Sequence, residues 1–185
     1  MRIVFCSAEV VPFTKTGGLA DVAGSLPQAL EELGHEIIII TPYYKAVKFT
    51  EVKSYSLNEV AVSRIGKNIK VYLIGHEKYF GRDGIYGDKN GDYADNLERF
   101  SFYSHESLRL LKRLEAPVDV IHCHDWHSAL IPVLLKNKYQ KDPFFKNIKS
   151  VFTIHNLAYQ GVFPKEQYSL LGLDPELFHI DGFEF

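Results

Sequence analysis

Four short runs of β-branched and other apolar residues, separated by longer segments of helical periodicity, limit what this chain can fold into. The runs cover residues 3–6, 37–41, 118–123 and 151–154. Each predicts a buried parallel strand, because strands covered on both faces are continuously apolar. Apolar residues recur every three or four positions over residues 19–33 and Gly34 follows, so a helix there completes a βαβ unit. Pro27 should kink or divide this helix, because proline lacks a backbone donor and clashes with the preceding turn.

Two segments between the strands have other patterns. Residues 60–74 alternate apolar and other side chains around Gly66-Lys67-Asn68, which predicts a β-hairpin. Residues 79–95 hold four glycines among charges and tyrosines, so no regular element is expected there. Either an ordered functional loop or a disordered flap fits this composition.

Two more helices are expected in the second half of the chain. One is capped near Asp95 or Asn96 and extends through Leu114, and another begins around Ser128. The alternation of strands and helices predicts one α/β domain over residues 1–185. We expect an open, mostly parallel Rossmann-like sheet with helices on both faces and a β-hairpin insertion.

The net charge argues against two classes of binding partner, and the cysteines indicate the redox compartment. Lys and Arg number 21 against 23 Asp and Glu, a net charge of −2, so neither nucleic acid nor an anionic membrane is expected as a partner. No apolar stretch approaches the roughly 20 residues of a membrane span, and no targeting segment is visible. Cys6 and Cys123 lie far apart along the sequence without paired metal-ligand spacing, which fits a reducing cytoplasm.

In open α/β sheets, ligands bind outside the carboxyl ends of the strands, which directs attention first to the loop before the first helix. Lys15-Thr16-Gly17-Gly18 stands at the entrance to that helix. Glycines let backbone amides approach an anion, the helix N-terminus adds partial positive charge, and Lys15 adds a full charge, so a phosphate or diphosphate would fit. The alternative is a glycine-rich turn that merely closes the connection beside an exposed lysine.

The second such segment holds His122, His124, Asp125 and His127 within six positions. Side chains alternate along a strand, so His122 and His124 should share one face, and Asp125 should lie where the chain leaves the sheet. The H-x-H-x-x-H spacing resembles a metallo-β-lactamase motif, but Trp126 stands where that motif has aspartate. We interpret His122, His124 and Trp126 as packing residues and Asp125 as the functional candidate.

The third segment, residues 151–161, ends a hydrophobic strand with a histidine, an amide, an aromatic residue and a glycine. A histidine at a strand end can orient a hydroxyl-rich ligand, but histidine is also common at half-buried structural positions. The residues alone leave both interpretations of His155 open.

Together, the three segments resemble the bacterial glycogen synthases and plant starch synthases that use ADP-glucose. The resemblance rests on residues 15–22 with Leu26-Pro27 behind them, on residues 124–127 and on residues 151–161. It implies a GT-B glycosyltransferase with two Rossmann-like domains facing each other across a cleft. This chain would be most of the N-terminal, acceptor-side domain, located in the bacterial cytoplasm. The C-terminal nucleotide-sugar domain would be absent.

The resemblance also implies roles for individual residues. Lys15 would meet the phosphates of ADP-glucose beside the amides of Gly17 and Gly18. Asp125 would line the sugar side of the cleft, and His155 would contact the transferred glucose near its reacting carbon.

Tyr86 resembles a family tyrosine that helps to bind the sugar, although the local spacing differs by one residue. The family's essential C-terminal glutamate and its Arg/Lys pair have no counterpart in this chain, so the chain alone is expected to be inactive.

The implied reaction transfers glucose from ADP-glucose to the non-reducing end of an α-1,4-glucan, with retention. Lysine cations and a helix N-terminus would stabilise the departing diphosphate, so no metal or other cofactor is expected. Two alternatives stay open. One is a non-catalytic module that binds glucan or sugar, and the other is a zinc hydrolase built on His122, His124 and His127.

Overall fold

A six-stranded, mostly parallel sheet forms the centre of the molecule in the computed structural model, which describes residues 1–47 and 60–182. The strand order is β3-β4-β2-β1-β7-β8, and every neighbouring pair is parallel except β3 and β4. The strands are β1 (Arg2–Cys6), β2 (Glu36–Pro42), β3 (Val60–Ile65), β4 (Ile69–Ile74), β7 (Val120–His124) and β8 (Lys149–Thr153). The predicted open α/β sheet is confirmed.

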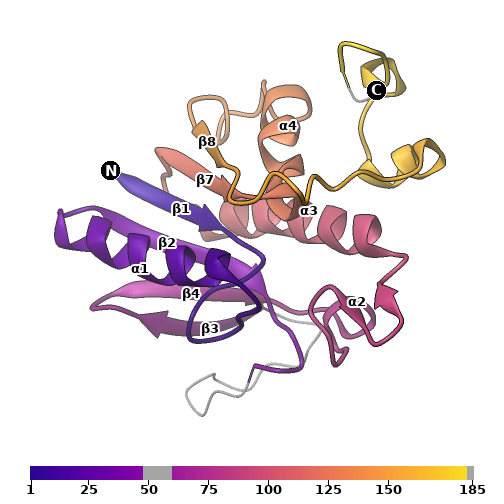
Figure 1. Cartoon of the computed structure of the whole chain (residues 1–185). Coiled ribbons are helices and arrows are strands. Elements are labelled where there is room, and N and C mark those ends of the chain that lie inside the picture. Colours follow the sequence, from indigo (N-terminus) through magenta and orange to yellow (C-terminus); the bar gives the residue numbers. More distant parts are fainter. Residues whose placement is uncertain (48–59, 183–185) are drawn as a thin grey trace.

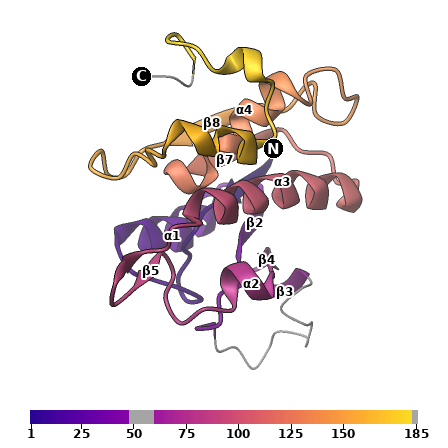
Figure 2. The same ribbon diagram turned by 90° about the vertical axis from the view of Figure 1, so that its right-hand side faces the viewer.

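Helices cover both faces of this sheet. Helix α1 lies on one face, and α3 and α4 pack together on the other (Figures 1 and 2). The helices are α1 (Gly18–Glu32), α2 (Glu77–Phe80), α3 (Asn96–Leu114) and α4 (Leu130–Asn137), with short 3-10 segments η1 (Trp126–Ser128), η2 (Lys165–Leu171) and η3 (Pro175–Leu177). Among the described helices, none combines the length and apolar character that crossing a membrane would require.

The core is densest around the two central strands. Val4, Phe5 and Cys6 of β1 are fully buried, and β2 is buried along almost its whole length. This double coverage explains the continuous apolar runs in the sequence. It also places Cys6 opposite Cys123 on the neighbouring strand, so two free cysteines that are distant in sequence lie side by side.

Strand β8 differs from the prediction of a buried strand. It is the edge of the sheet, and 46% of Val151 and 41% of Phe152 are exposed. An apolar run has the same appearance in sequence at an edge as in the interior, so the pattern identified the strand but not its burial.

The predicted hairpin is confirmed as β3 and β4, with Gly66 in the left-handed region at φ +59°. Strand β4 also pairs in parallel with β2, so the hairpin extends the central sheet instead of standing outside it. The Glu31 carboxylate supports the turn by accepting hydrogen bonds from the backbone N–H groups of Lys67 (2.9 Å) and Asn68 (2.6 Å).

Pro27 lies inside one continuous helix, so it does not divide α1 as one of the two expectations had it. Close packing holds this helix against the preceding loop. A Cβ at Gly24 would stand 2.9 Å from the carbonyl oxygen of Val11, so glycine permits the approach at that position. Helix α3 has its predicted limits, and α4 begins two residues after Ser128, where a helix was expected; the short α2 was not predicted.

Residues 79–95 contain short regular elements, so the prediction of none in this segment is wrong. This loop holds the end of α2 and a small antiparallel hairpin whose two strands have two residues each, β5 (Gly87–Asp88) and β6 (Gly91–Asp92). The buried guanidinium of Arg99 donates hydrogen bonds to the carbonyl oxygens of Tyr79 (2.8 Å) and Ile85 (2.9 Å). These bonds anchor the loop to α3 on either side of residues 81–84, and residues 81–86 are mostly half-buried.

Candidate functional site

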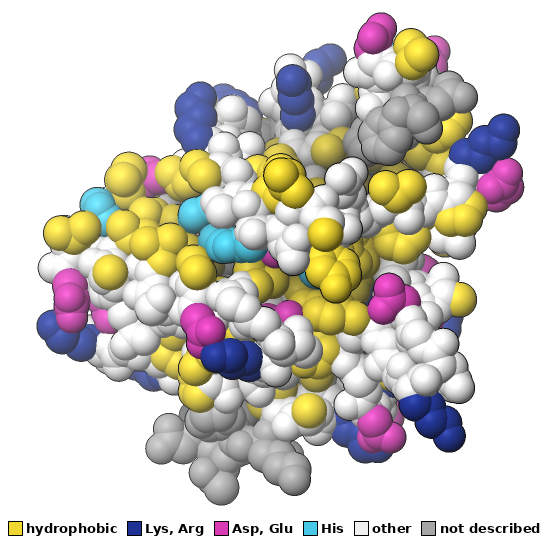
Figure 3. Space-filling model, viewed as in Figure 1, with side chains coloured by type: hydrophobic (Ala, Val, Ile, Leu, Met, Phe, Trp, Pro, Cys, Tyr) yellow, Lys and Arg dark blue, Asp and Glu magenta, His cyan; other side chains and the backbone are white. Residues whose placement is uncertain are grey.

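The carboxyl ends of β1, β7 and β8 lie next to one another in the sheet, and the three predicted segments follow them directly. Histidine side chains lie among hydrophobic ones on the left and centre of the face shown in Figure 3. The sheet topology therefore places the loop before α1, the end of β7 and the end of β8 on the same side of the sheet, at the carboxyl ends of its strands.

Lys15 is an exposed residue of the loop that enters α1. Its Nζ lies 2.7 Å from Oδ1 and 2.8 Å from Oδ2 of Asp21, and more than half of each side chain is exposed. Such an exposed ion pair is weak in water. The Lys15 charge is thus available to an incoming anion that can compete with Asp21.

The two glycines after Thr16 are not required by the shape of the turn. Gly17 has φ −149°, and neither glycine has its backbone in the left-handed region. A Cβ at either position would meet no heavy atom within 4 Å. The alternative of a purely structural glycine turn therefore lacks a steric reason, whereas a ligand approaching the backbone would need this open space.

The amide of Gly17 points to a carboxylate in this structure. It donates a hydrogen bond to Oε2 of Glu9 at 3.3 Å. Gly18 is the first residue of α1, where backbone N–H groups have no partner within the helix. An anion at this helix end would therefore meet the Gly18 amide and the Lys15 ammonium.

Glu9 is the residue that sequence reasoning missed. Only 3% of it is exposed, and its Oε1 accepts hydrogen bonds from the hydroxyls of Thr16 and Tyr86, both at 2.6 Å. Its Oε2 accepts from the amides of Thr16 and Gly17. The one available signal was an acidic residue in an apolar run directly after a strand.

Tyr86 joins the site despite its irregular spacing in the sequence. Its ring stacks on His127 at 4.6 Å between centroids, and its hydroxyl reaches Glu9. Burial raises the pKa of Tyr86 well above its usual range, and the nearby Tyr44, Glu9 and Asp125 raise it further. The hydroxyl therefore stays protonated and acts as a hydrogen-bond donor.

Asp125 and His155 are in direct contact. Oδ1 of Asp125 accepts the backbone N–H of His155 at 2.7 Å, and the Asp125 amide donates to the carbonyl of Thr153 at 2.9 Å. Asp125 has φ +55° and ψ 177°, an unusual conformation for a residue other than glycine. Strained residues of this kind concentrate at functional sites, which agrees with Asp125 as the candidate at this strand end.

The histidines of β7 form a neutral, packed group. His122 and His124 share one face as predicted; His122 Nε2 lies 2.7 Å from Thr153 Oγ1, and His124 Nδ1 lies 3.0 Å from His155 Nε2. Burial, with His122 and His155 nearby, lowers the pKa of His124 to about 3. Burial and the Arg99 guanidinium likewise lower the pKa of His127 to about 3.

The geometry does not support the zinc-hydrolase alternative. His127 packs between Tyr86 and Phe100, whereas His122 and His124 contact Thr153 and His155. Across residues 1–47 and 60–182, no three His, Cys, Asp or Glu side chains are grouped so that they could hold a metal ion.

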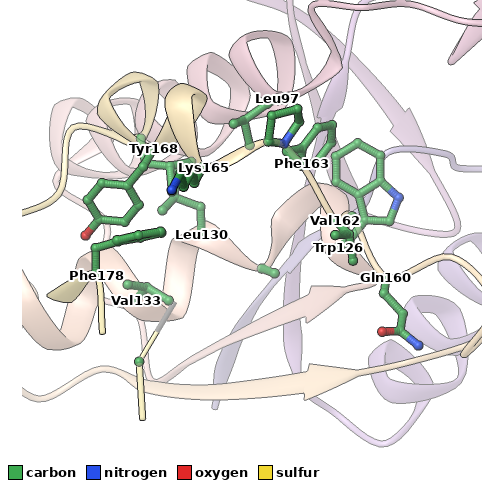
Figure 4. A pocket seen from close by; sticks show the side chains of 15 residues that line it. Leu97, Trp126, Leu130, Val133, Gln160, Val162, Phe163, Lys165, Tyr168 and Phe178 are labelled. Atoms are coloured by element: carbon green, nitrogen blue, oxygen red, sulfur yellow. The ribbon is translucent and has the colours of Figure 1, made fainter. Parts of the chain in front are cut away.

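A cavity of about 490 Å³ lies beside this site (Figure 4). Trp126 and Gln160 stand at one end of it, and Tyr168 and Phe178 at the other. Trp126 packs against Phe100 with ring centroids 5.0 Å apart, as predicted for a packing residue, and it also forms part of the cavity wall. None of the predicted site residues lines this cavity.

Comparison with known proteins identifies similar sequences along the whole chain. Residues 2–185 match the family described as the starch synthase catalytic domain. Glycogen synthase 2 of Geobacter metallireducens is 45% identical over 199 residues, which cover 100% of this chain and 41% of that protein. Glycogen synthase of Bacillus cereus is 43% identical over 199 residues, again 100% of this chain and 41% of that protein.

A solved structure is similar as well. The catalytic domain of starch synthase IV from Arabidopsis thaliana, bound to ADP and acarbose, superposes with a TM-score of 0.82 at 31% identity. The match covers 97% of this chain and 39% of that one. The chain therefore spans about two fifths of the length of these relatives.

Proposed function

The chain belongs to the starch synthase catalytic domain family, and from this premise we propose that it forms the acceptor-side half of a retaining GT-B glucosyltransferase. The proposed reaction transfers glucose from ADP-glucose to the non-reducing end of an α-1,4-glucan. Relatives named glycogen synthase support this reaction, as does a neighbour described as bound to ADP and acarbose. We propose the bacterial cytoplasm as its location.

One observation carries the proposal. Asp125 and His155, the two residues expected at the sugar, are joined by a hydrogen bond from the His155 backbone N–H to the Asp125 carboxylate. This contact lies at the carboxyl ends of the strands, where the loop of Lys15 also begins. Tyr86 is joined to that loop through Glu9. Residues from four distant parts of the chain thus lie on the side of the sheet where open α/β sheets bind ligands.

The charges of this group suit the proposed chemistry. As the bond to the diphosphate breaks, negative charge develops on the leaving group and positive charge on the sugar. Lys15 and the N-terminus of α1 would stabilise the diphosphate, and the Asp125 carboxylate would stabilise the sugar. The backbone N–H of His155 holds that carboxylate in place before the substrate arrives. Such preorganisation lowers the barrier, because no dipoles need to reorient during the reaction.

We further propose that activity requires a second domain equivalent to the part of the relatives that lies outside the match. The resemblance assigns to that domain a glutamate and an Arg/Lys pair that act on the donor. The chain alone should therefore show no transfer. It would supply the acceptor side of the cleft and the Lys15 contact to the donor.

A chimaera tests this proposal. Glycogen synthase 2 of Geobacter metallireducens, with its matching segment replaced by this chain, is supplied with radiolabelled ADP-glucose and glycogen. We expect label in the glycogen, with the unmodified relative as positive control and the chain alone as negative control. A folded chimaera that binds glycogen but transfers nothing would overturn the proposal in favour of a glucan-binding module.

A further inference from the structure

Glu9 is a buried carboxylate whose surroundings are unusual. Glutamate is almost never fully buried unless it is paired, yet only 3% of Glu9 is exposed. Within the described part of the chain, no lysine, arginine or histidine forms an ion pair with it. Four hydrogen-bond donors compensate its charge instead: two hydroxyls at Oε1 and two backbone amides at Oε2.

These donors come from two segments of the chain that otherwise have separate supports. Thr16 and Gly17 belong to the loop of Lys15, which ends in α1. Tyr86 lies 77 positions after Glu9, in the loop that Arg99 anchors to α3. Glu9 thus links the loop that carries Lys15, through Thr16 and Gly17, with the tyrosine proposed for the sugar.

Two further contacts set the orientation of Tyr86. The His127 ring stacks on the Tyr86 ring and limits its tilt, and the Asn96 amide donates to the Tyr86 carbonyl at 2.8 Å. Neither contact fixes the rotation of the ring within its own plane or the direction of the O–H bond. Oε1 of Glu9 holds both, through the charge-assisted hydrogen bond that it accepts from the hydroxyl.

We propose that Glu9 is a positioning residue that holds the loop of Lys15 and Tyr86 in one fixed arrangement, so that the phosphate and sugar contacts of a single ADP-glucose form together. This inference rests on the proposed glucosyltransferase function. It assigns Glu9 no contact with the reacting atoms. Its effect passes through Thr16, Gly17 and Tyr86.

A double-mutant cycle in the active chimaera distinguishes positioning from a merely structural role. Glu9→Ala should lower kcat/KM for ADP-glucose by about 10- to 100-fold, as expected for loss of hydrogen bonds to a charged group. Tyr86→Phe alone should also lower kcat/KM. The double variant should be no more than about twofold worse than Glu9→Ala, because Tyr86 depends on Glu9 for its placement.

Glu31→Ala is the matched control, since the Glu31 carboxylate also holds a turn through two backbone amides, but at the β3-β4 hairpin. It should leave kcat/KM within about twofold. If Glu9→Ala does not fold, Glu9→Gln replaces it. The glutamine side chain has nearly the same shape, but it lacks the charge and has one acceptor oxygen instead of two, so it cannot accept all four hydrogen bonds. KM for ADP-glucose should therefore rise in this variant while the chain still folds.

The outcomes separate the two proposals. A chimaera that is inactive with Glu9 intact contradicts the proposed function. The positioning role is overturned if the fold-losses in kcat/KM of the Glu9 and Tyr86 variants multiply in the double variant of an active chimaera. It is also overturned if Glu9→Gln leaves KM and kcat unchanged. Faster hydrogen exchange at the Thr16 and Gly17 amides of the Glu9→Gln chain would support it, and unchanged exchange would count against it.

Discussion

Replacement of Lys15 by alanine should affect activity far more than stability. The Lys15 ammonium is paired with Asp21, and the two side chains are 53% and 55% exposed. Solvent screens such a pair, so its loss should cost about 0.2–1 kcal/mol of unfolding free energy. For a domain of this size, that cost corresponds to a melting temperature lower by at most about 4 °C. In the cleft, by contrast, loss of a preorganised contact to developing charge costs about 10² to 10³ in rate.

Lys45→Ala is the matched control for this prediction. Lys45 forms a similar exposed pair with Asp83, at 2.8 Å compared with 2.7 Å for Lys15 and Asp21. Both variants are compared by thermal melting of the chain and by kcat/KM for ADP-glucose in the chimaera. Equal small shifts in melting temperature with a large loss of activity only for Lys15→Ala are expected. The reasoning is refuted if Lys15→Ala keeps kcat/KM within a few-fold of the unmodified chimaera, or if it melts like a core deletion.

Three further outcomes are expected. Gly17→Ala and Gly18→Ala should melt within a few degrees of the unmodified chain, since a Cβ at either position meets no heavy atom within 4 Å. Both should lower kcat/KM for ADP-glucose in the chimaera. Strongly lowered melting temperatures would contradict the open space at these two positions. The pKa of His127 falls from 6.5 to about 3 on folding, so the unfolded chain takes up the proton first as pH decreases. The free energy of unfolding should therefore drop between pH 6.5 and pH 3, by up to about 1.4 kcal/mol per pH unit. Measured by denaturant unfolding, this pH slope should be shallower in His127→Gln, and equal slopes would refute the assignment. Arg99→Lys should accelerate proteolysis between residues 80 and 95. The guanidinium of Arg99 donates to two carbonyl oxygens at once, and a lysine ammonium cannot reach both. Unchanged cleavage would show that other contacts hold the loop.

Local patterns predicted most of the fold, and they failed where the outcome depended on distant partners. The periodicity of residues 19–33 and the β-branched runs identified α1 and the parallel strands. Nothing in the run 151–154 distinguished an edge strand from a buried one, because burial depends on what packs outside the strand. For the same reason, the pairing of the hairpin with β2 was not visible in its own sequence.

The site was predictable as far as the rule for carboxyl strand ends applies. That rule selected Asp125 and His155, and the structure brings them into contact. Glu9 was missed because the donors that define it include a tyrosine 77 positions away. The hydrogen bond from the Gly17 amide to Glu9 was missed with it, and the phosphate contact of Gly17 stays a prediction.

A crystal structure of the chimaera with ADP-glucose bound tests the central claim most directly. We expect Lys15 to have left Asp21, with its Nζ at hydrogen-bond distance, about 2.7–3.2 Å, from a phosphate oxygen. The glucose should lie against Asp125 and His155, with the Tyr86 hydroxyl still held by Glu9. Phosphates bound elsewhere, with Lys15 still paired to Asp21 and no sugar near Asp125, would contradict it.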